Sequence, residues 1–370
     1  MGTDKKFIIS GGGTGGHVFP AIAIANAVKA KCPSAEILFV GAKGRMEMEK
    51  VPEAGYQIIG LNISGIQRKL TLKNISTFFK LIGSLVKAKK IIKQFKPDIV
   101  IGVGGYASGP VLRVASNLKI PTLIQEQNSY PGITNRILSK NVNRICVAYE
   151  GMEKYFPEEK IILTGNPVRQ DIYVLDGKKE MGLKIFGLDN TKKSILVVGG
   201  SLGARTINEA ILNGLELFKK NNIQLIWQTG KAFFATAQQA CNDFKDAGIA
   251  AYAFITRMDY AYASADLVIS RAGAIAISEI CVTKKPAILI PSPNVAEDHQ
   301  TKNALSLSKK TAAILVKDNE ARDILVKEAI GLINDKQMCE KIVSNITRFA
   351  HKNAADSIAD IILDMIKKQE

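Results

Sequence analysis

The sequence predicts two Rossmann-like α/β domains, each with a parallel β-sheet, facing each other across a cleft. Short apolar runs such as FIIS, ILFV and IVIGVGG alternate with amphipathic stretches, which is typical of βα units. After a lysine-rich connector, KKSILVVGGSLGA from Lys192 repeats KKFIISGGGTGG from Lys5. The length of 370 residues is ample for two such domains. We expect the first domain to cover residues 1–165, with a helix at 353–370 packing back on it, and the second to cover residues 166–352.

The first element is a strand, a glycine-rich turn and a helix between Phe7 and Pro20. Three apolar residues lead into a turn with five glycines before helical apolar spacing resumes. Glycine suits such a turn because it adopts positive φ and lets the backbone approach a bulky anion. The N–H groups at the start of the helix, with Pro20 suited to its first turn, would then bind a phosphate. Gly11, Gly13 and Gly16 also match the pattern G-x-G-x-x-G.

A nicotinamide dinucleotide is nevertheless a poor candidate for this loop. Dinucleotide-binding folds carry an Asp or Glu at the end of the second strand, about 20 residues further on, to hold a ribose. The second strand expected here, at residues 37–40, is followed by Gly-Ala-Lys. In the repeat, the strand expected at 223–227 is followed by Gln-Thr-Gly. We therefore predict that the loops bind a phosphate or a polar substrate and that the protein uses no dinucleotide or other cofactor.

A second glycine-rich loop, at residues 102–110, follows a strand expected at 99–101. Both glycine loops of the first half stand at carboxyl ends of strands, where open α/β sheets bind their ligands. The loop is longer than a tight turn requires, which favours function over a purely structural role. In the second half we expect further strands at 252–255, 267–270 and 287–290, because each is a short apolar run.

Positive charge is concentrated between Arg68 and Lys96, which hold nine Lys or Arg and no acidic residue. Apolar residues at helical spacing interrupt this stretch, so it predicts a helix with an apolar face and cationic flanks. It is either a packed helix with a solvated lysine face or a surface that binds anionic lipid headgroups. Nucleic acid is disfavoured, despite the net charge of +16, because most of the basic residues are lysines and no aromatic residues are arranged for stacking. The apolar positions are Leu72, Ile75, Phe78, Phe79, Ile82, Leu85 and Val86.

The overall composition indicates a globular protein in a reducing compartment. Hydrophobic residues make up 46% of the chain and charged residues 23%. The five cysteines are scattered without C-x-x-C spacing, which argues against disulfides and a zinc site. No signal peptide and no apolar run of about 18 residues is present, so we expect no membrane span. The sequence contains no Asp-x-Asp pair, the usual carboxylate pair for a metal that bridges a diphosphate. A leaving diphosphate would therefore be stabilised by helix N-termini. The loop at 199–204, with Ser201 as an extra hydrogen-bond donor, is well suited to this task.

The sequence has three histidines, of which His17 is the candidate for acid–base chemistry. His17 follows the first glycine loop at a helix N-terminus, where the helix dipole lowers the pKa of an imidazole and favours the neutral form that accepts a proton. A capping or structural role would also explain His17, and Glu126 is a second candidate for the general base. His299 lies in a polar cluster able to hydrogen-bond a hydroxylated ligand, whereas His351 is expected to be solvated.

Seven motifs, taken in order, resemble those of the MurG family of glycosyltransferases. They are GGGTGGH, GVGGYASGP, QEQN, GNPVR, GGSLGAR, SRAGAIAISE and EDHQTKNA. The resemblance implies a two-domain glycosyltransferase of the GT-B type. It would transfer GlcNAc, with inversion, from UDP-GlcNAc to the MurNAc 4-hydroxyl of undecaprenyl-pyrophosphoryl-MurNAc-pentapeptide (lipid I) in peptidoglycan synthesis. The family acts on the cytoplasmic face of the bacterial inner membrane, which implies peripheral contact with an anionic membrane surface.

The resemblance also implies which residues contact the substrates. The acceptor would lie on the first domain, with Tyr106 and Ser108 at its pyrophosphate, and the donor mainly on the second. Within the donor site, Ile255 would face the uracil, Glu279 the ribose hydroxyls and Gln300 the sugar. A UDP-GlcNAc 2-epimerase and a diacylglycerol glycosyltransferase remain alternatives on the same architecture. The full set of expected donor contacts is Thr14, Gly15, Gly16, Asn128, Arg169, Ser201, Ile255, Ala274, Ile275, Ala276, Ile277, Ser278, Glu279 and Gln300.

Overall fold

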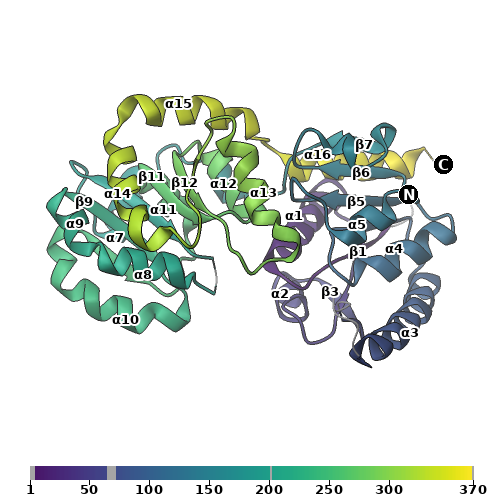
Figure 1. The fold of residues 1–370 in the computed structure, drawn as a ribbon. Coiled ribbons are helices and arrows are strands. Elements are labelled where there is room, and N and C mark those ends of the chain that lie inside the picture. Colours follow the sequence, from purple (N-terminus) through teal and green to yellow (C-terminus); the bar gives the residue numbers. More distant parts are fainter. Residues whose placement is uncertain (1–4, 65–71, 201, 369–370) are drawn as a thin grey trace. The chain divides into compact units, whose positions relative to one another are not determined.

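The computed structural model describes residues 5–64, 72–200 and 202–368, without the side chains of residues 72–78 and 296 (Figure 1). The chain divides into two compact units. Unit 1 runs to Val168 and includes the segment from Asn353, and unit 2 covers Arg169 to Lys352. Two predicted features lie outside the described residues: Ser201, and the start of the basic stretch at Arg68.

Unit 1 is built on a parallel sheet of seven strands in the order β3-β2-β1-β4-β5-β6-β7. Strand β1 pairs with β2 through Phe7 and Ile37, and with β4 through Phe7 and Ile99. Helices cover both faces, so the strands bury their side chains on each side and read as unbroken apolar runs. The strands are β1 Lys6–Ser10, β2 Glu36–Ala42, β3 Gln57–Leu61, β4 Ile99–Gly102, β5 Thr122–Glu126, β6 Arg144–Val147 and β7 Ile161–Leu163.

The two faces of this sheet carry different sets of helices. On one face, α16 packs against α1, and Ile358 and Ile362 of α16 share an apolar cluster with Ile24 of α1. On the other face, α3 packs beside α4. The elements of unit 1 are α1 Gly15–Lys31, α2 Glu47–Glu53, α3 Leu72–Phe95, α4 Ser108–Asn117, α5 Ile133–Leu138, η1 Met152–Lys154, η2 Glu158–Lys160 and α16 Ala354–Lys367.

Unit 2 repeats the plan with six parallel strands in the order β10-β9-β8-β11-β12-β13. The predicted class, two Rossmann-like domains with parallel sheets, is therefore confirmed. The strands are β8 Lys193–Val198, β9 Ile223–Gln228, β10 Ile249–Tyr252, β11 Leu267–Arg271, β12 Ala287–Ile290 and β13 Ile314–Leu315. The helices are α6 Gln170–Tyr173, α7 Lys179–Phe186, α8 Arg205–Asn213, α9 Leu215–Lys220, α10 Lys231–Cys241, η3 Asn242–Ala247, α11 Met258–Ser264, α12 Ala274–Thr283, η4 Ala296–Asp298, α13 His299–Ser308, α14 Ala321–Asn334, α15 Lys336–Ile346 and η5 Thr347–Phe349.

One expected strand is displaced. The run at 252–255 was expected to be a strand, but β10 covers Ile249–Tyr252. Gly248, with φ of +72°, turns the chain in the left-handed region and starts the strand earlier. Ile255 therefore lies beyond the strand, in the loop at its carboxyl end.

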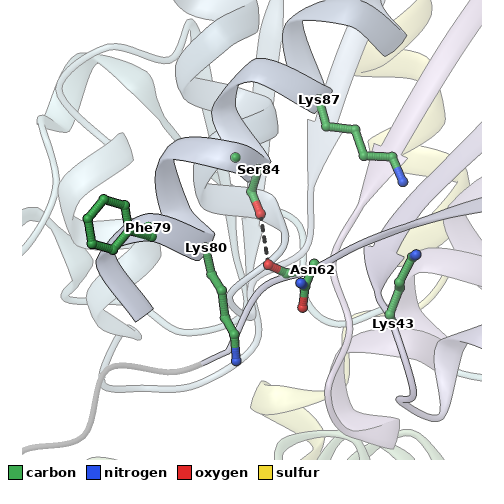
Figure 2. Close-up of a pocket in the computed structure, with 7 residues that line it drawn as sticks. Lys43, Asn62, Phe79, Lys80, Ser84 and Lys87 are labelled. Atoms are coloured by element: carbon green, nitrogen blue, oxygen red, sulfur yellow. Dashed lines mark hydrogen bonds between the residues drawn. The ribbon is translucent and has the colours of Figure 1, made fainter. Parts of the chain in front are cut away.

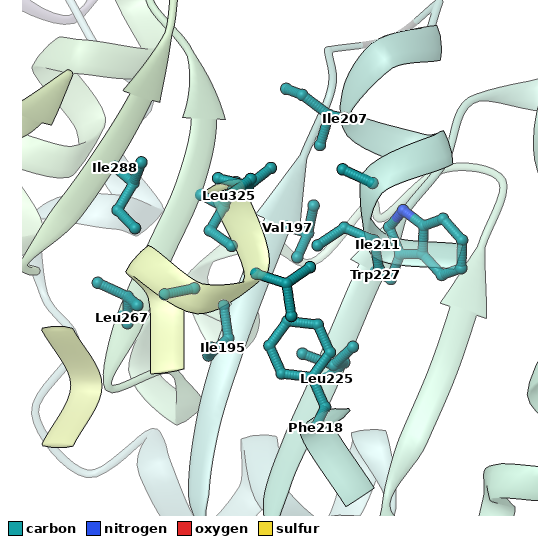
Figure 3. Close-up of a cluster of buried hydrophobic side chains, with 14 of the residues drawn as sticks. Ile195, Val197, Ile207, Ile211, Phe218, Leu225, Trp227, Leu267, Ile288 and Leu325 are labelled. Carbon is teal, nitrogen blue, oxygen red and sulfur yellow. The ribbon is translucent and has the colours of Figure 1, made fainter. Parts of the chain in front are cut away.

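The core of unit 2 is an apolar cluster around Trp227, which is fully buried (Figure 3). The indole Nε1 donates to Asn208 Oδ1 over 3.0 Å, so its one polar group is satisfied. The Asn208 amide donates in turn to the Thr229 carbonyl over 2.8 Å. The core thus fixes the loop that follows β9. Other members of the cluster are Ile195, Val197, Ile207, Ile211, Phe218, Leu225, Leu267, Ile288 and Leu325.

Candidate active site

The two glycine loops of unit 1 lie in direct contact, because β1 and β4 are neighbours in the sheet. A Cβ on Gly105 would lie 2.4 Å from the carbonyl oxygen of Gly12. A Cβ on Gly11 would lie 2.2 Å from a methyl group of Val103. The loops can approach this closely only without side chains, and Gly105 also needs its φ of +82°.

This contact gives a first prediction. Replacing Gly105 by alanine is expected to lower the free energy of unfolding by about 1–3 kcal/mol, because the methyl group meets backbone and φ is positive. Urea unfolding measures the loss. Gly132→Ala is the matched control, since a Cβ on Gly132 meets nothing within 4 Å and the φ of Gly132 is −63°. Equal stabilities of the two variants would contradict the prediction.

His17 lies in the first turn of α1, directly against the second glycine loop. Its Nδ1 is 3.3 Å from the hydroxyl oxygen of Thr14, the residue that caps the helix. A Cβ on Gly104 would lie 2.9 Å from His17 Nε2. Thr14 can therefore orient the ring from one side while the edge bearing Nε2 faces the loop that contains Gly104.

Glu47, which the sequence reasoning missed, joins the first glycine loop to the end of β2. Its side chain is buried. One carboxylate oxygen accepts from the Gly13 N–H over 2.8 Å and the other from the Ala42 N–H over 2.9 Å. A Cβ on Gly12 would clash with this carboxylate at 2.1 Å. The only signal in the sequence was an acidic residue in the first turn of a helix, which is too common to identify it.

Glu126, the alternative base, is buried at the end of β5 and is fully engaged. Oε1 accepts from the backbone and side-chain amides of Asn128, and Oε2 from the Gly132 N–H and the Asn135 amide. Desolvation raises the pKa of Glu126, and these hydrogen bonds oppose the rise. The carboxyl group thus holds the loop after β5 in place, and all its acceptor positions are used within that loop and by Asn135.

The two residues expected at the acceptor pyrophosphate differ in exposure. Tyr106 is exposed. Ser108 is buried, and its hydroxyl donates to the Gly105 carbonyl over 2.9 Å. Ser108 therefore stabilises the loop, which leaves Tyr106 and the backbone N–H groups to meet a ligand.

In unit 2, the loops after β8 and β9 are packed together in the same manner. A Cβ on Gly203 would lie 2.1 Å from the Thr229 carbonyl oxygen. The Gln228 side chain extends this contact, since its amide donates to the Gly200 carbonyl over 3.4 Å and its Oε1 accepts from the Ile255 N–H over 2.8 Å. One side chain therefore links the glycine loop to the position expected to face the uracil.

Glu279 lies on α12 and is partly exposed. The pKa of its carboxyl group is shifted from the ordinary value. Desolvation raises the pKa of its carboxyl group to about 7, opposed by the Tyr262 hydroxyl and by the Arg169 guanidinium. The Tyr262 hydroxyl donates to Oε2 over 3.1 Å. A carboxyl group that titrates near neutral pH at the carboxyl edge of a parallel sheet is typical of a functional site.

Six more of the expected donor residues lie on α12 and α13. Ala274 and Ile277 are buried, whereas Ile275, Ala276 and Ser278 are half-buried. These five residues form the first turns of α12, whose N-terminus favours negative charge. In α13, Gln300 Oε1 accepts from the Ser292 N–H over 2.8 Å.

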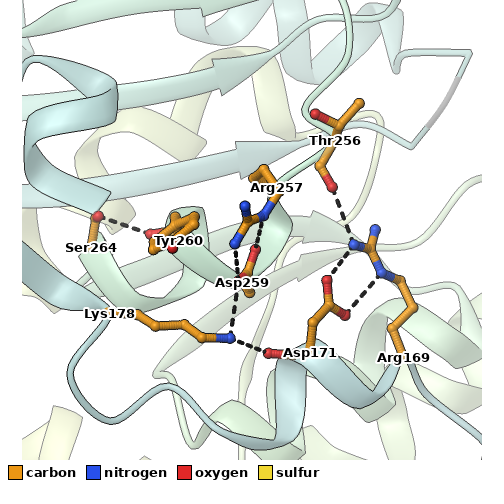
Figure 4. A network of polar contacts seen from close by, with 8 residues as sticks. All are labelled: Arg169, Asp171, Lys178, Thr256, Arg257, Asp259, Tyr260 and Ser264. Carbon is orange, nitrogen blue, oxygen red and sulfur yellow. Dashed lines mark hydrogen bonds and ion pairs between the residues drawn. The ribbon is translucent and has the colours of Figure 1, made fainter. Parts of the chain in front are cut away.

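A network of charged groups surrounds the loop after β10 (Figure 4). Arg169 pairs with Asp171 and donates to the Thr256 carbonyl over 3.1 Å. Asp259, whose side chain is 1% exposed, accepts from Lys178 over 2.9 Å and from Arg257 over 3.0 Å. The segment that opens unit 2 is thus tied to the loop that carries Ile255. Only Arg169 was predicted, because the sequence does not show which charged side chains the fold brings together.

This network gives a second prediction. Burial acts to raise the pKa of Asp259, but hydrogen bonds from Arg257 and Lys178 outweigh it and hold the pKa well below its ordinary range. Asp259→Asn is expected to lower the free energy of unfolding by about 2 kcal/mol, because two cations lose their partner. The loss should be constant from about pH 5 to 8 and shrink in stronger acid, as protonation removes the same contribution from the wild type.

Urea unfolding of Asp259→Asn and the wild type measures this difference. Asp243→Asn, at an exposed aspartate of the same unit, is the control. A loss no larger than that of the control would show that the network adds nothing to stability.

A partly buried ion pair, also not predicted, fixes the carboxyl edge of the second sheet. The Arg271 guanidinium pairs with Asp318 and donates to the Ile290 carbonyl over 3.2 Å. Asp318 also accepts from the Thr206 hydroxyl over 3.0 Å. The ends of β11 and β12 are thereby held against the start of α8.

Neither a metal centre nor a membrane span occurs in the described part of the chain. Across residues 5–64, 72–200 and 202–368, no three His, Cys, Asp or Glu side chains are arranged to hold a metal ion. None of the helices in these ranges is both long enough and apolar enough to cross a membrane.

Both halves of the chain match domains of one known family. Residues 7–147 match the glycosyltransferase family 28 N-terminal domain, and residues 194–360 match its C-terminal domain. The chain is 54% identical to the UDP-N-acetylglucosamine–N-acetylmuramyl-(pentapeptide) pyrophosphoryl-undecaprenol N-acetylglucosamine transferase of Parabacteroides distasonis, covering 98% of this chain and 99% of the relative. It is 53% identical to the transferase of the same name from Flavobacterium psychrophilum, covering 99% of each. The crystal structure of Acinetobacter baumannii MurG superposes with a TM-score of 0.79 at 28% identity, covering 97% of this chain and 99% of that one.

Proposed function

The chain belongs to glycosyltransferase family 28, and from this premise we propose that it transfers GlcNAc from UDP-GlcNAc to lipid I, forming lipid II in peptidoglycan synthesis. The observation that carries the proposal is the similarity to transferases of this activity along nearly the whole chain. The acceptor is assigned to unit 1 and the donor mainly to unit 2.

In unit 1, His17 is the general base. Nε2 removes the proton of the MurNAc 4-hydroxyl while that oxygen attacks the anomeric carbon of the donor and UDP leaves, with inversion. Nε2 can accept the proton only if Nδ1 carries a hydrogen. Thr14 supports this tautomer because its hydroxyl oxygen lies within reach of Nδ1. The helix dipole also favours the neutral imidazole.

The acceptor pyrophosphate is assigned to the paired glycine loops. Their backbone N–H groups and the start of α1 favour an anion without a metal ion. Tyr106, which is exposed beside the loop, can hydrogen-bond the same group. Contact between the two loops brings this site next to His17.

In unit 2, the diphosphate of the donor is assigned to the loop after β8 and the first turn of α8. The N-terminus of α8 would stabilise the charge that develops as UDP leaves. Glu279 accepts hydrogen bonds from the ribose hydroxyls, Ile255 faces the uracil and Gln300 contacts the sugar. Gln228 supports this arrangement, since it ties the Ile255 backbone to the glycine loop.

We also assign the protein to the cytoplasmic face of the inner membrane as a peripheral protein. The support is helix α3, whose Phe79, Ile82 and Val86 are exposed on a helix that carries many lysines and no acidic residue. Of the apolar face predicted here, the side chains of Leu72, Ile75 and Phe78 lie outside the described residues.

The test is transfer of radiolabelled GlcNAc from UDP-GlcNAc to a lipid I analogue. Label is expected in the lipid product only when the acceptor is present. Epimerisation of UDP-GlcNAc in the absence of acceptor would instead support a 2-epimerase. Transfer to diacylglycerol but not to lipid I would support a diacylglycerol glycosyltransferase.

A further inference from the structure

Glu47 is a buried carboxylate that no proposed substrate contact uses. It is the first residue of α2 and is 1% exposed, and no cation in the described part of the chain forms an ion pair with it. A buried carboxylate is costly unless it is paired or hydrogen-bonded. Here each oxygen accepts from one backbone N–H, that of Gly13 over 2.8 Å and that of Ala42 over 2.9 Å. Glu47 therefore bridges the first glycine loop and the end of β2.

Two glycines make room for this bridge. A Cβ on Gly12 would overlap the carboxylate of Glu47, and a Cβ on Gly41 would lie 2.6 Å from its Cγ. Gly12 and Gly13 have φ of +146° and +93°, which residues with side chains rarely adopt. Such glycines are free to take many conformations, so contacts from outside the loop must select one of them.

The first glycine loop is held from two sides. Because β1 lies between β2 and β4 in the sheet, the loop has the end of β2 on one side and the second glycine loop on the other. Glu47 holds it from the β2 side. On the β4 side, Gly105 packs against the backbone of Gly12. The position of the loop thus depends on both neighbours.

The point to which Glu47 ties the loop is itself fixed. Ala42 is the last residue of β2, and the N–H of the next residue, Lys43, donates to the Leu61 carbonyl of β3 over 2.9 Å. Lys87 of α3 donates to the Gly60 carbonyl of β3 over 2.8 Å, and Figure 2 shows its amino group turned toward that of Lys43. The end of β2 is therefore tied to β3 and, through β3, to α3.

The segment after Gly13 carries the groups that are assigned to the acceptor. Thr14 caps α1, and its hydroxyl oxygen lies 3.3 Å from His17 Nδ1. The N–H groups of Thr14, Gly15 and Gly16 have no partner among the described residues, as is usual at the start of a helix. The Gly13 N–H, by contrast, is occupied by the buried carboxylate. One N–H therefore holds the loop, and three are left for an anion.

We propose that Glu47 is a positioning residue for the acceptor. Its carboxylate fixes the turn at Gly12 and Gly13 so that the free N–H groups at the start of α1 meet the acceptor pyrophosphate while His17 meets the hydroxyl group. Glu47 acts through the loop and touches neither substrate. This role rests on the function proposed above, in which unit 1 binds the acceptor.

The test is steady-state kinetics with UDP-GlcNAc and a water-soluble lipid I analogue on two graded variants. Glu47→Gln keeps the shape of the side chain but leaves one backbone N–H without an acceptor, and Glu47→Met leaves both without one. We expect kcat/KM for the acceptor to fall at least about tenfold in Glu47→Gln and further in Glu47→Met. The KM for UDP-GlcNAc should stay within about twofold of the wild type, because the donor is assigned mainly to unit 2. Glu49→Gln, which removes an exposed carboxylate from the same helix, is the matched control.

Binding of inorganic pyrophosphate separates positioning from a loss of stability. The titration is done by calorimetry with saturating UDP, which fills the donor site. We expect Glu47→Gln to bind pyrophosphate at least about fivefold more weakly than the wild type and to keep its affinity for UDP. If Glu47 served stability alone, the variant would unfold at lower urea but retain both affinities. Pyrophosphate binding that is unchanged or tighter in Glu47→Gln would overturn the proposal.

Hydrogen exchange tests the same contact in the wild type, without a substitution. In the free protein, the Gly13 N–H is expected to exchange at least about tenfold more slowly than those of Thr14 and Gly15, because it alone is hydrogen-bonded. Inorganic pyrophosphate should slow the exchange of Thr14 and Gly15 and leave that of Gly13 unchanged. Amide-resolved NMR in deuterated water measures these rates. Equal rates for the three groups in the free protein would overturn the proposal even if the variants did not fold.

Failure of this proposal can be told from failure of the proposed function. A wild type that does not transfer GlcNAc to the analogue would remove the transferase, and the pyrophosphate titration would still test Glu47. A wild type that does transfer GlcNAc, together with Glu47→Gln kinetics equal to those of Glu49→Gln, would overturn the role of Glu47 and leave the transferase intact. An equal loss for donor and acceptor in Glu47→Gln would overturn it as well.

Discussion

Replacement of His17 by alanine is expected to lower kcat by about 10²–10⁴-fold and to change the KM for UDP-GlcNAc little. A general base contributes a factor of this size in the transition state, and the donor is assigned mainly to unit 2, whereas His17 lies in unit 1. The imidazole lies against Gly104 and within reach of Thr14, so its orientation is fixed before substrate arrives. Steady-state kinetics with a lipid I analogue measures both constants.

Two controls keep this result interpretable. His351→Ala removes a histidine outside the site and should retain the wild-type kcat. Thr14→Val should lower kcat by a smaller factor than His17→Ala, because the base remains but its tautomer is less well fixed. An unchanged kcat in a folded His17→Ala protein would remove His17 from the mechanism and require another base.

The strands and their parallel arrangement were the part of the fold most open to prediction. A strand buried on both faces must be a short apolar run, and the glycine turn after it is unmistakable in both halves. The displaced strand β10 shows the limit of this reasoning. The run at 252–255 is more apolar and aromatic than Ile249–Tyr252, yet the turn at Gly248 and pairing with β9 decide the boundary.

The candidate site was predictable only in part, because a sequence does not show which polar groups are already satisfied. Glu126 remained a candidate for the base beside His17 until the structure filled all the acceptor positions of Glu126. Glu47 was missed because both of its hydrogen-bond partners are backbone N–H groups. Every residue except proline has such a group, so the sequence contains no sign of the contact.

Replacement of Glu279 by glutamine is expected to raise the KM for UDP-GlcNAc about 100-fold at pH 8 and to leave kcat nearly unchanged. An ionised carboxylate that accepts from two ribose hydroxyls contributes about 3 kcal/mol, most of which glutamine loses. In the wild type, kcat/KM for the donor should fall as pH drops below about 7, because the pKa of Glu279 is raised to about 7 and the protonated form accepts poorly. Glu279→Gln should lack this pH dependence.

The same substitution is expected to stabilise the protein at alkaline pH. Because the pKa of Glu279 is higher in the folded state, that state binds more protons between about pH 4.5 and 7. Its free energy of unfolding therefore decreases as pH rises through this window, by at most about 3 kcal/mol. Glutamine does not ionise, so Glu279→Gln should match the wild type near pH 4.5 and exceed its stability at pH 8. A variant that binds the donor more weakly but is more stable at pH 8 would show that the Glu279 carboxylate serves function rather than stability. A loss of stability at pH 8 would instead show that Glu279 stabilises the fold.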